Sequence, residues 1–396
     1  MRQPLYLLSL FSFLCITAAG NPSSDSVTGR NYYYISAYYQ LGKVMSTNKF
    51  LKGENYAGEP IRSSQSLAVE FGKQTSVNKE WQQLYGYPKI GAGLSVLDFS
   101  YARETGIPIT LYGFFNAPFI RWRAASLNFN IGMGMTSNWK PYTSGNNPWN
   151  IAVGSLVTAY IDLGSDLSWA VSNHLDFNVG IHFIHSSNGG VTLPNAGINQ
   201  VGLRMALSYN FSPQRPVFIK QEIGKFVKTW EWLAQAGWGP KQITCDTIAR
   251  VNKNYSNKVN YNVFILRSAV LRQVSHKVKL GMGVDLTYKG SNSILIAWEN
   301  GKAVKQTVPL RENLLLSGYG SVELVIDRLG IALQPGFYLI RTETYNSSPA
   351  FYQQLDIKYH LFKSGNFFVG LALRAYKFQV ADFIEWNLGY RIRWKS

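Results

Sequence analysis

The chain has 396 residues, of which 14% are aromatic and only 15% charged, with 35 glycines and a formal net charge of +17. After residue 20 the apolar runs are too short for a transmembrane helix, and Cys245 is the one cysteine, which excludes a disulfide framework and a cysteine-based zinc site. The basic residues are scattered among aromatic segments, whereas a nucleic-acid-binding protein gathers them into polar clusters.

Residues 1–20 have the layout of a secretory signal peptide. Arg2 gives a short positive start, an apolar run follows over residues 5–16, and Ala18, Ala19 and Gly20 supply small residues at the expected cleavage site. We therefore expect the protein to be exported and this segment to be removed.

Alternation of apolar and polar residues with period two recurs from Tyr32 to the end of the chain, which is typical of β-strands. The alternating segments have about the ten residues that a tilted membrane strand needs, and turn-rich pieces such as 143–148 and 289–293 separate them. Together with the abundance of Tyr, Phe, Trp and Gly, this predicts an all-β fold, an antiparallel transmembrane β-barrel of the outer membrane. A large secreted β-sandwich or propeller is the alternative. The clearest predicted strands lie at 66–75, 93–102, 108–117, 126–135, 262–271, 277–288, 319–328, 366–378 and 384–394.

The two halves of the chain resemble each other. Residues 119–134 are similar to 270–283, and 175–211 loosely parallels the last part of the chain. We expect a duplicated barrel unit, with a first barrel over residues 21–212, a connecting segment over 213–240 and a second, degenerate barrel unit over 241–396. Two small barrels and one wider barrel both fit this pattern.

One strand ends in an unusual set of polar residues. In 175–187 the odd-numbered positions share a face that is apolar as far as Phe183 and then carries His185 and Ser187, so these two side chains extend the lipid-facing stripe at its rim. His182 falls on the opposite face, toward the barrel interior, and has no partner that the sequence reveals.

The following segment brings a third polar group to the same place. Asn188-Gly189 starts a turn-type segment, and the returning strand has alternating apolar residues that put Asn199 on the outer face near His185. On this arrangement His185 would be a general base and Ser187 a nucleophile, and Asn188, Gly189 and Gly190 would supply donors to an oxyanion. The alternative is an interfacial strand end followed by a turn, which is the commoner meaning of such a motif.

The sequence HSSNGG at 185–190, followed by PNAGI at 194–198, resembles the active-site signature of the PagL family, the outer-membrane lipid A 3-O-deacylases. The family pattern reads approximately H-x-S-N-A-G, a short gap, and P-N-x-G-I-E. The resemblance implies an eight-stranded barrel with a lipid-facing site that hydrolyses the ester-linked acyl chain at position 3 of lipid A. It assigns the base to His185, the nucleophile to Ser187, and the oxyanion role to Asn188 with Gly190.

One position departs from the family. The acidic residue that orients the histidine corresponds to Asn199, whose amide oxygen accepts a hydrogen bond but carries no charge to stabilise an imidazolium. Glu385 in the second half is the acid that a loose alignment suggests as a substitute, but alternation points it away from the apolar face. Because the second half also lacks an H-x-S-N motif, we predict that it is catalytically silent.

The sequence therefore predicts a serine esterase of the Gram-negative outer membrane that acts on lipid A in lipopolysaccharide. No metal, cofactor or nucleic acid is part of this prediction, and the scattered basic residues suit the phosphates of lipid A. The alternatives are a non-enzymatic barrel, either a channel or an envelope-interaction protein, and a lipid acyltransferase.

Overall fold

The computed structural model describes residues 32–76, 79–218, 222–244, 258–292, 296–299, 302–305, 309–341, 349–362, 364–378 and 380–395. The predicted signal peptide lies outside these residues. Within them, no helix is both long and apolar enough to cross a membrane.

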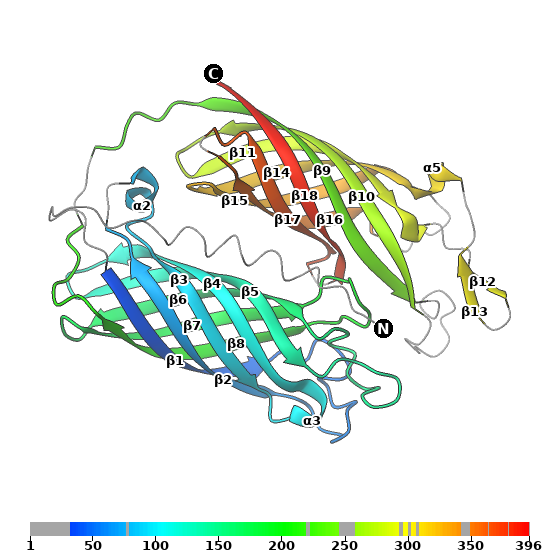
Figure 1. Cartoon of the computed structure of the whole chain (residues 1–396), viewed down its shortest axis with the longest axis horizontal. Coiled ribbons are helices and arrows are strands. Elements are labelled where there is room, and N and C mark those ends of the chain that lie inside the picture. The colour runs from blue at the N-terminus through cyan, green and yellow to red at the C-terminus, as the bar shows by residue number, and fades with distance from the viewer. Residues whose placement is uncertain are drawn as a thin grey trace. The chain divides into compact units, whose positions relative to one another are not determined.

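The first half folds into a closed antiparallel barrel in which each strand pairs with the next and β1 closes the barrel against β8 (Figure 1). Two short helices, α2 (Glu80–Leu84) and α3 (Ala102–Thr105), lie in its connections. The strands are β1 (Tyr32–Val44), β2 (Ser63–Gln74), β3 (Lys89–Asp98), β4 (Gly106–Arg121), β5 (Ala125–Trp139), β6 (Thr158–Ala170), β7 (Leu175–Ser187) and β8 (Ile198–Asn210).

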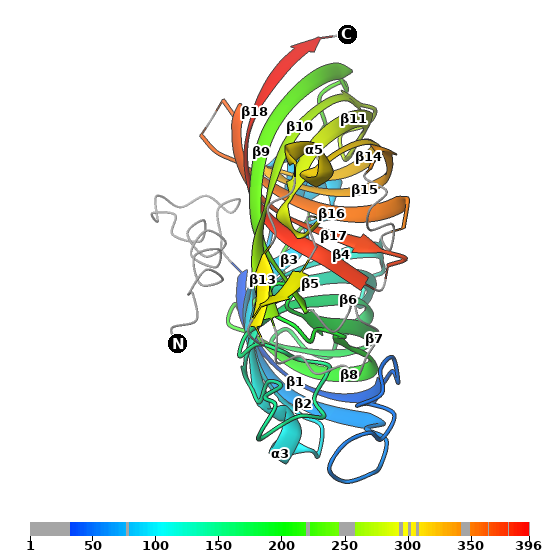
Figure 2. The ribbon, with the colours of Figure 1, turned by 90° about the vertical axis from the view of Figure 1, so that its right-hand side faces the viewer.

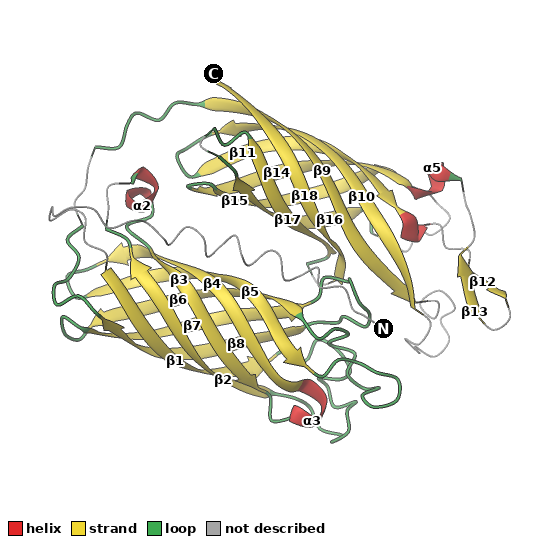
Figure 3. Ribbon diagram, viewed as in Figure 1, coloured by secondary structure: helices red, strands yellow, loops and turns green. Residues whose placement is uncertain are grey.

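The second half forms a closed barrel of its own, which β9 completes by pairing with both β10 and β18 (Figures 2 and 3). Its connections hold the hairpin β12 (Ile296–Glu299) and β13 (Lys302–Lys305), the 3-10 turn η3 (Gly290–Asn292) and the short helix α5 (Leu310–Asn313). The barrel strands are β9 (Thr229–Thr244), β10 (Lys258–Gln273), β11 (Val278–Lys289), β14 (Leu314–Ile326), β15 (Leu329–Ile340), β16 (Phe351–His360), β17 (Phe367–Tyr376) and β18 (Val380–Lys395).

The predicted outer-membrane-type barrel fold is confirmed, and of the two architectures that the sequence left open the structure has two eight-stranded barrels. The start of the second barrel differs from the expected connecting segment, because β9 begins at Thr229, inside 213–240. Small and turn-type residues at 236–240 weaken the strand pattern of β9, and its inward positions Glu231 and Gln235 are polar although buried. Strand alternation alone therefore does not reveal β9.

Side chains fill the interior of the first barrel, as in other small barrels. Tyr34, Tyr38, Tyr112, Tyr160 and Ile184 form one buried cluster there. The opposite faces of the same strands are exposed and apolar, so the predicted alternation of inward polar or aromatic and outward apolar residues holds.

His182 lies inside this barrel, as predicted, and the structure gives it partners that the sequence did not reveal. Its Nδ1 lies 2.8 Å from Asp162 Oδ1 and its Nε2 lies 2.8 Å from Asp166 Oδ1, and Arg204 Nη2 donates to Asp162 Oδ2 at 2.7 Å. The carboxylates come from β6, whose register against β7 single-strand alternation does not give. His182 thus belongs to a buried ionic network rather than to a site.

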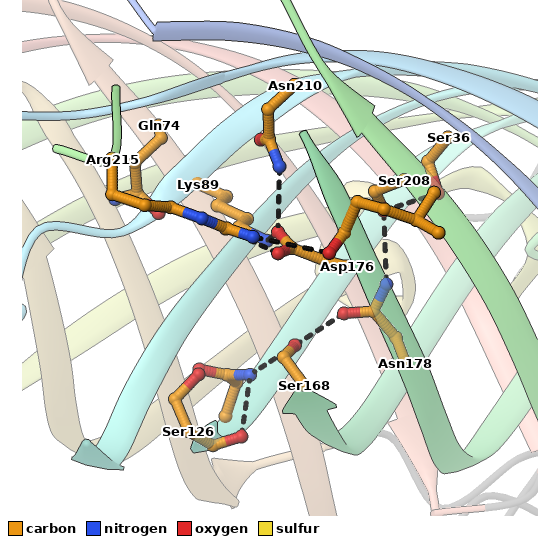
Figure 4. Close-up of polar contacts among 12 residues, drawn as sticks. Ser36, Gln74, Lys89, Ser126, Ser168, Asp176, Asn178, Ser208, Asn210 and Arg215 are labelled. Carbon is orange, nitrogen blue, oxygen red and sulfur yellow. Dashed lines mark hydrogen bonds and ion pairs between the residues drawn. The ribbon is translucent and has the colours of Figure 1, made fainter. Parts of the chain in front are cut away.

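The two ends of the first barrel differ. At the end that holds the short turns 122–124 and 171–174, polar side chains bind one another across the mouth, and Asp176 accepts hydrogen bonds from Lys89, Asn210 and, beyond β8, Arg215 (Figure 4). At the opposite end, the long connections at 45–62 and 140–157 contribute to a buried apolar cluster that includes Phe50, Leu51, Trp139, Val153 and Ile198. The motif at 185–190 lies at this long-loop end.

Candidate active site

The structure brings together the three residues that the sequence singled out on the outer wall. His185 on β7 and Asn199 on β8 are directly opposite each other in the antiparallel register. His185 Nδ1 lies 2.6 Å from Asn199 Oδ1, and His185 Nε2 lies 2.9 Å from Ser187 Oγ. The imidazole therefore bridges the amide and the hydroxyl.

These two hydrogen bonds define which nitrogen carries the proton. The amide oxygen of Asn199 only accepts, so Nδ1–H of His185 donates to it. Nε2 then has a lone pair directed at Ser187 Oγ, and the serine hydroxyl donates to it. This tautomer is the one in which a histidine takes a proton from a serine.

The outward residues of β7 and β8 that lie farther from the rim than these three are apolar. On β7, Ile181 is 64% exposed and Phe183 is 36% exposed, and on β8 Val201 and Leu203 are 41% and 44% exposed. The polar groups thus sit where the apolar stripe meets the rim, the placement expected from alternation. Polar groups at such a wall cost free energy unless they are paired, and the Ser187–His185–Asn199 chain supplies that pairing.

Ser187 is only 5% exposed, and Gly197, just before β8, packs against it. Gly197 has a φ of +70°, and a Cβ at this position would lie 3.3 Å from His185 Cε1 and 3.4 Å from Ser187 Cβ. A glycine is favoured here both by the left-handed backbone and by the contact with the two side chains. The sequence motif contains this glycine, but its contact with the site could not be read from spacing.

Polar contacts fix the connection over the site. The Asn188 N–H donates to Asn195 Oδ1 at 2.9 Å, and Asn188 Nδ2 donates to Ser155 Oγ at 3.1 Å. From the first connection, Asn48 Nδ2 donates to the Gly197 carbonyl oxygen at 3.1 Å. Asn195, Ser155 and Asn48 were not predicted as site residues, and only the PN pair of the motif pointed to Asn195.

The predicted oxyanion residues follow Ser187 directly. Gly189 and Gly190 have φ values of +65° and +85°, a backbone conformation that glycine adopts readily. The backbone N–H of Asn188 donates to Asn195 Oδ1 and its side-chain Nδ2 donates to Ser155 Oγ, so both groups hold this residue in place directly after Ser187.

Glu385 does not take part in this arrangement. It lies on β18 of the second barrel, is 1% exposed, and accepts a hydrogen bond from Arg267 Nη1 at 2.8 Å. Its inward orientation agrees with the alternation of β18. The place opposite the histidine is occupied by Asn199.

Comparison with known proteins gives two family matches and weaker structural likenesses. Among solved structures, Neisserial surface protein A has 10% identity and a TM-score of 0.30, over 45% of this chain and 97% of its own. The Acinetobacter baumannii outer membrane protein Omp33 has 7% identity and a TM-score of 0.17, over 91% of this chain and 99% of its own. No curated protein sequence matches the chain.

The family matches cover both barrels. Residues 66–208 match the model of lipid A 3-O-deacylase (PagL), and residues 230–394 match the model of the acyloxyacyl hydrolase C-terminal domain, a PagL C-terminal domain. The first match includes the motif at 185–198 and the strands that carry it. Between them the two models span most of the chain, which therefore belongs to the PagL family of outer-membrane lipid A 3-O-deacylases.

Proposed function

We propose that the protein is an outer-membrane serine esterase that hydrolyses the ester-linked acyl chain at position 3 of lipid A. The observation that carries this proposal is the hydrogen-bonded chain Ser187–His185–Asn199 at the rim of an apolar wall, within a region that matches the deacylase family. An acyl chain of a membrane lipid reaches such a wall without leaving the bilayer.

In the proposed reaction, Ser187 Oγ attacks the ester carbonyl carbon while His185 Nε2 takes the hydroxyl proton. The bond from that carbon to the sugar oxygen breaks, and His185 returns the proton to the leaving sugar hydroxyl. Water then attacks the acyl-serine with the same proton relay, which releases the fatty acid and restores Ser187. Asn199 holds the tautomer that both steps require.

The negative charge on the carbonyl oxygen in each step needs donors. We assign these to Asn188 and to the backbone of Gly189 and Gly190, which follow the nucleophile directly. The anchoring of Asn188 by Asn195 and Ser155 supports a preorganised loop at this place.

A packed interior supports a wall site over a transport role for the first barrel. Its aromatic cluster and the His182–Asp162–Arg204 network occupy the space that a channel would need. The polar residues on the wall, by contrast, have no structural counterpart elsewhere on β7 and β8, where the outward positions are apolar.

The test is mass spectrometry of lipid A from Gram-negative cells that express the protein. We expect loss of one hydroxyacyl chain with the wild type and no loss with Ser187→Ala or His185→Ala. Each variant is first checked for folding by the heat-dependent mobility of barrels on gels. An unchanged lipid A profile with the folded wild type would overturn the enzymatic proposal, and a gain of mass on an acceptor lipid would indicate an acyltransferase.

A further inference from the structure

The second barrel has a polar cavity of about 350 Å³ at the end where its short turns lie. The turns 274–277 and 327–328 join strands at this end, and β18 finishes there near the C-terminus (Figure 1). In outer-membrane barrels the short turns face the periplasm. A ligand of this cavity therefore enters from the periplasmic side.

Cations outnumber carboxylates among the side chains that line the cavity. The basic lining residues are Lys279, Arg328, Arg391 and Arg393, and the acidic ones are Glu323 and Asp327. The buried carboxylate of Glu231 accepts hydrogen bonds from three of these cations, at 2.8 Å from Lys279, 3.3 Å from Arg391 and 2.9 Å from Arg393. Glu323 is likewise shared, between Lys279 and Lys358. Positive charge at this end of the barrel is thus incompletely neutralised.

Arg391 has an unsatisfied donor beside the cavity. The residue is only 6% exposed, yet its Nε has no hydrogen-bond partner among the residues that the structure describes. A Cβ at Gly365, which has a φ of +64°, would lie 2.7 Å from Arg391 Nη2, so a side chain there would occupy the space next to the guanidinium. His360 Nδ1–H donates to the Gly365 carbonyl oxygen at 3.0 Å and holds this turn in place. A buried donor without a partner costs free energy, which an oxyanion in the cavity would recover.

The rim of the cavity continues onto the outer wall through Phe362. This ring lines the cavity, is 67% exposed, and meets the Phe367 ring edge-on with 6.4 Å between the centroids. Phe367 in turn lies 4.8 Å from the Tyr390 ring, and both residues are on the outward face. Aromatic residues at the ends of barrel strands mark the membrane interface. The cavity is therefore within reach of both soluble periplasmic anions and the headgroups of inner-leaflet phospholipids.

We propose that this cavity binds a phosphate group, with the guanidinium groups of Arg391 and Arg393 as its main donors and Arg328 at its mouth. Guanidinium forks match paired phosphate oxygens, and the Lys279 ammonium adds a point charge. The volume is near the lower end of small-molecule sites and suits a phosphate with a small alcohol such as glycerol. The site is separate from the ester chemistry at Ser187 and does not depend on it.

The test is isothermal titration calorimetry of the full-length protein in an uncharged detergent. The probes are glycerol phosphate, dihexanoyl phosphatidylglycerol and, as the phosphate-free control, dihexanoylglycerol. We expect saturable binding of a phosphate-bearing probe and none of dihexanoylglycerol. Arg391→Lys keeps the charge but loses the fork, and should weaken binding about tenfold. Arg328→Ala, at an exposed position, should weaken it about threefold.

Arg311→Ala is the matched control and should leave binding unchanged, because Arg311 is exposed in the connection at the other end of the same barrel. Folding of each variant is checked by heat-dependent mobility on gels, and Arg328→Ala keeps the test decisive if Arg391→Lys does not fold. Tighter binding of dihexanoyl phosphatidylglycerol than of glycerol phosphate would assign the phosphate to a phospholipid headgroup, and equal binding would assign it to a soluble ester. No saturable binding of either probe, or binding that both arginine substitutions leave unchanged, would overturn the proposal and leave Arg391 as a structural partner of Glu231.

Discussion

The two barrels share one construction and differ on their walls. Inside both, buried charges pair: Asp162 with Arg204 and His182 in the first barrel, and Glu323 with Lys279 and Lys358 in the second. Outside, both present exposed apolar residues, such as Leu203 on β8 and Leu388 on β18. The inward charges therefore pair with one another, whereas the His185 group faces outward at the rim of the apolar wall.

The largest effect on kcat/KM should come from Ser187, which faces outward. Its neighbour Ser186 faces the barrel interior and serves as the control. Ser187→Ala should lower kcat/KM for lipid A by about four orders of magnitude, since it removes the proposed nucleophile. Ser186 is 1% exposed, points into the barrel, and its hydroxyl has no hydrogen-bond partner among the described residues. Ser186→Ala should keep the rate within a factor of about two, and similar losses for both variants would contradict the assignment of the outward face.

A substitution inside the second barrel should lower the stability of the protein without changing the rate of deacylation. Glu323→Gln removes the carboxylate that pairs with both Lys279 and Lys358, which are buried, and should lower the free energy of unfolding by about 3 kcal/mol. Denaturant unfolding in detergent measures this, with the outward-facing Val322→Ala as control. Deacylation per folded molecule should stay at the wild-type level. A loss of rate in proportion to the loss of stability would mean that the second barrel takes part in the reaction.

Asn199 stands at the position where the family pattern has an acidic residue, so its substitution tests what that charge contributes. The amide already holds His185 in the productive tautomer, so Asn199→Asp adds only a charge that stabilises the imidazolium. We expect kcat/KM to rise about tenfold with Asn199→Asp and to fall about tenfold with Asn199→Ala. No gain with a folded aspartate variant would indicate that the wall around His185 disfavours a second charge more than the imidazolium benefits from it.

Period-two alternation was enough to predict the barrel class and the outward orientation of His185 and Ser187, because strand geometry is local. It also placed Asn199 near them, since β8 follows β7 directly in the chain and pairs with it. It did not reveal the partners of His182, which come from β6, or the hydrogen bond from Asn48 to Gly197, which joins the first connection of the first barrel to the last one. Those contacts depend on barrel closure and loop packing, which single-strand patterns do not encode.

The smallest effect concerns Gly197, where the connection touches the site. Gly197→Ala introduces strain at φ +70° and a methyl group 3.3 Å from His185 Cε1, so we expect kcat/KM to fall about threefold as the imidazole shifts by a few tenths of an ångström. Gly58 is the matched control, because it has a φ of +68° in the first connection with no atom within 4 Å of a built Cβ. Gly58→Ala should cost a similar free energy of unfolding, about 1 kcal/mol, and leave kcat/KM unchanged. The difference in rate between the two variants isolates the contact with His185 from backbone strain, and an equal rate loss in both would mean that loop strain, and not that contact, limits the site.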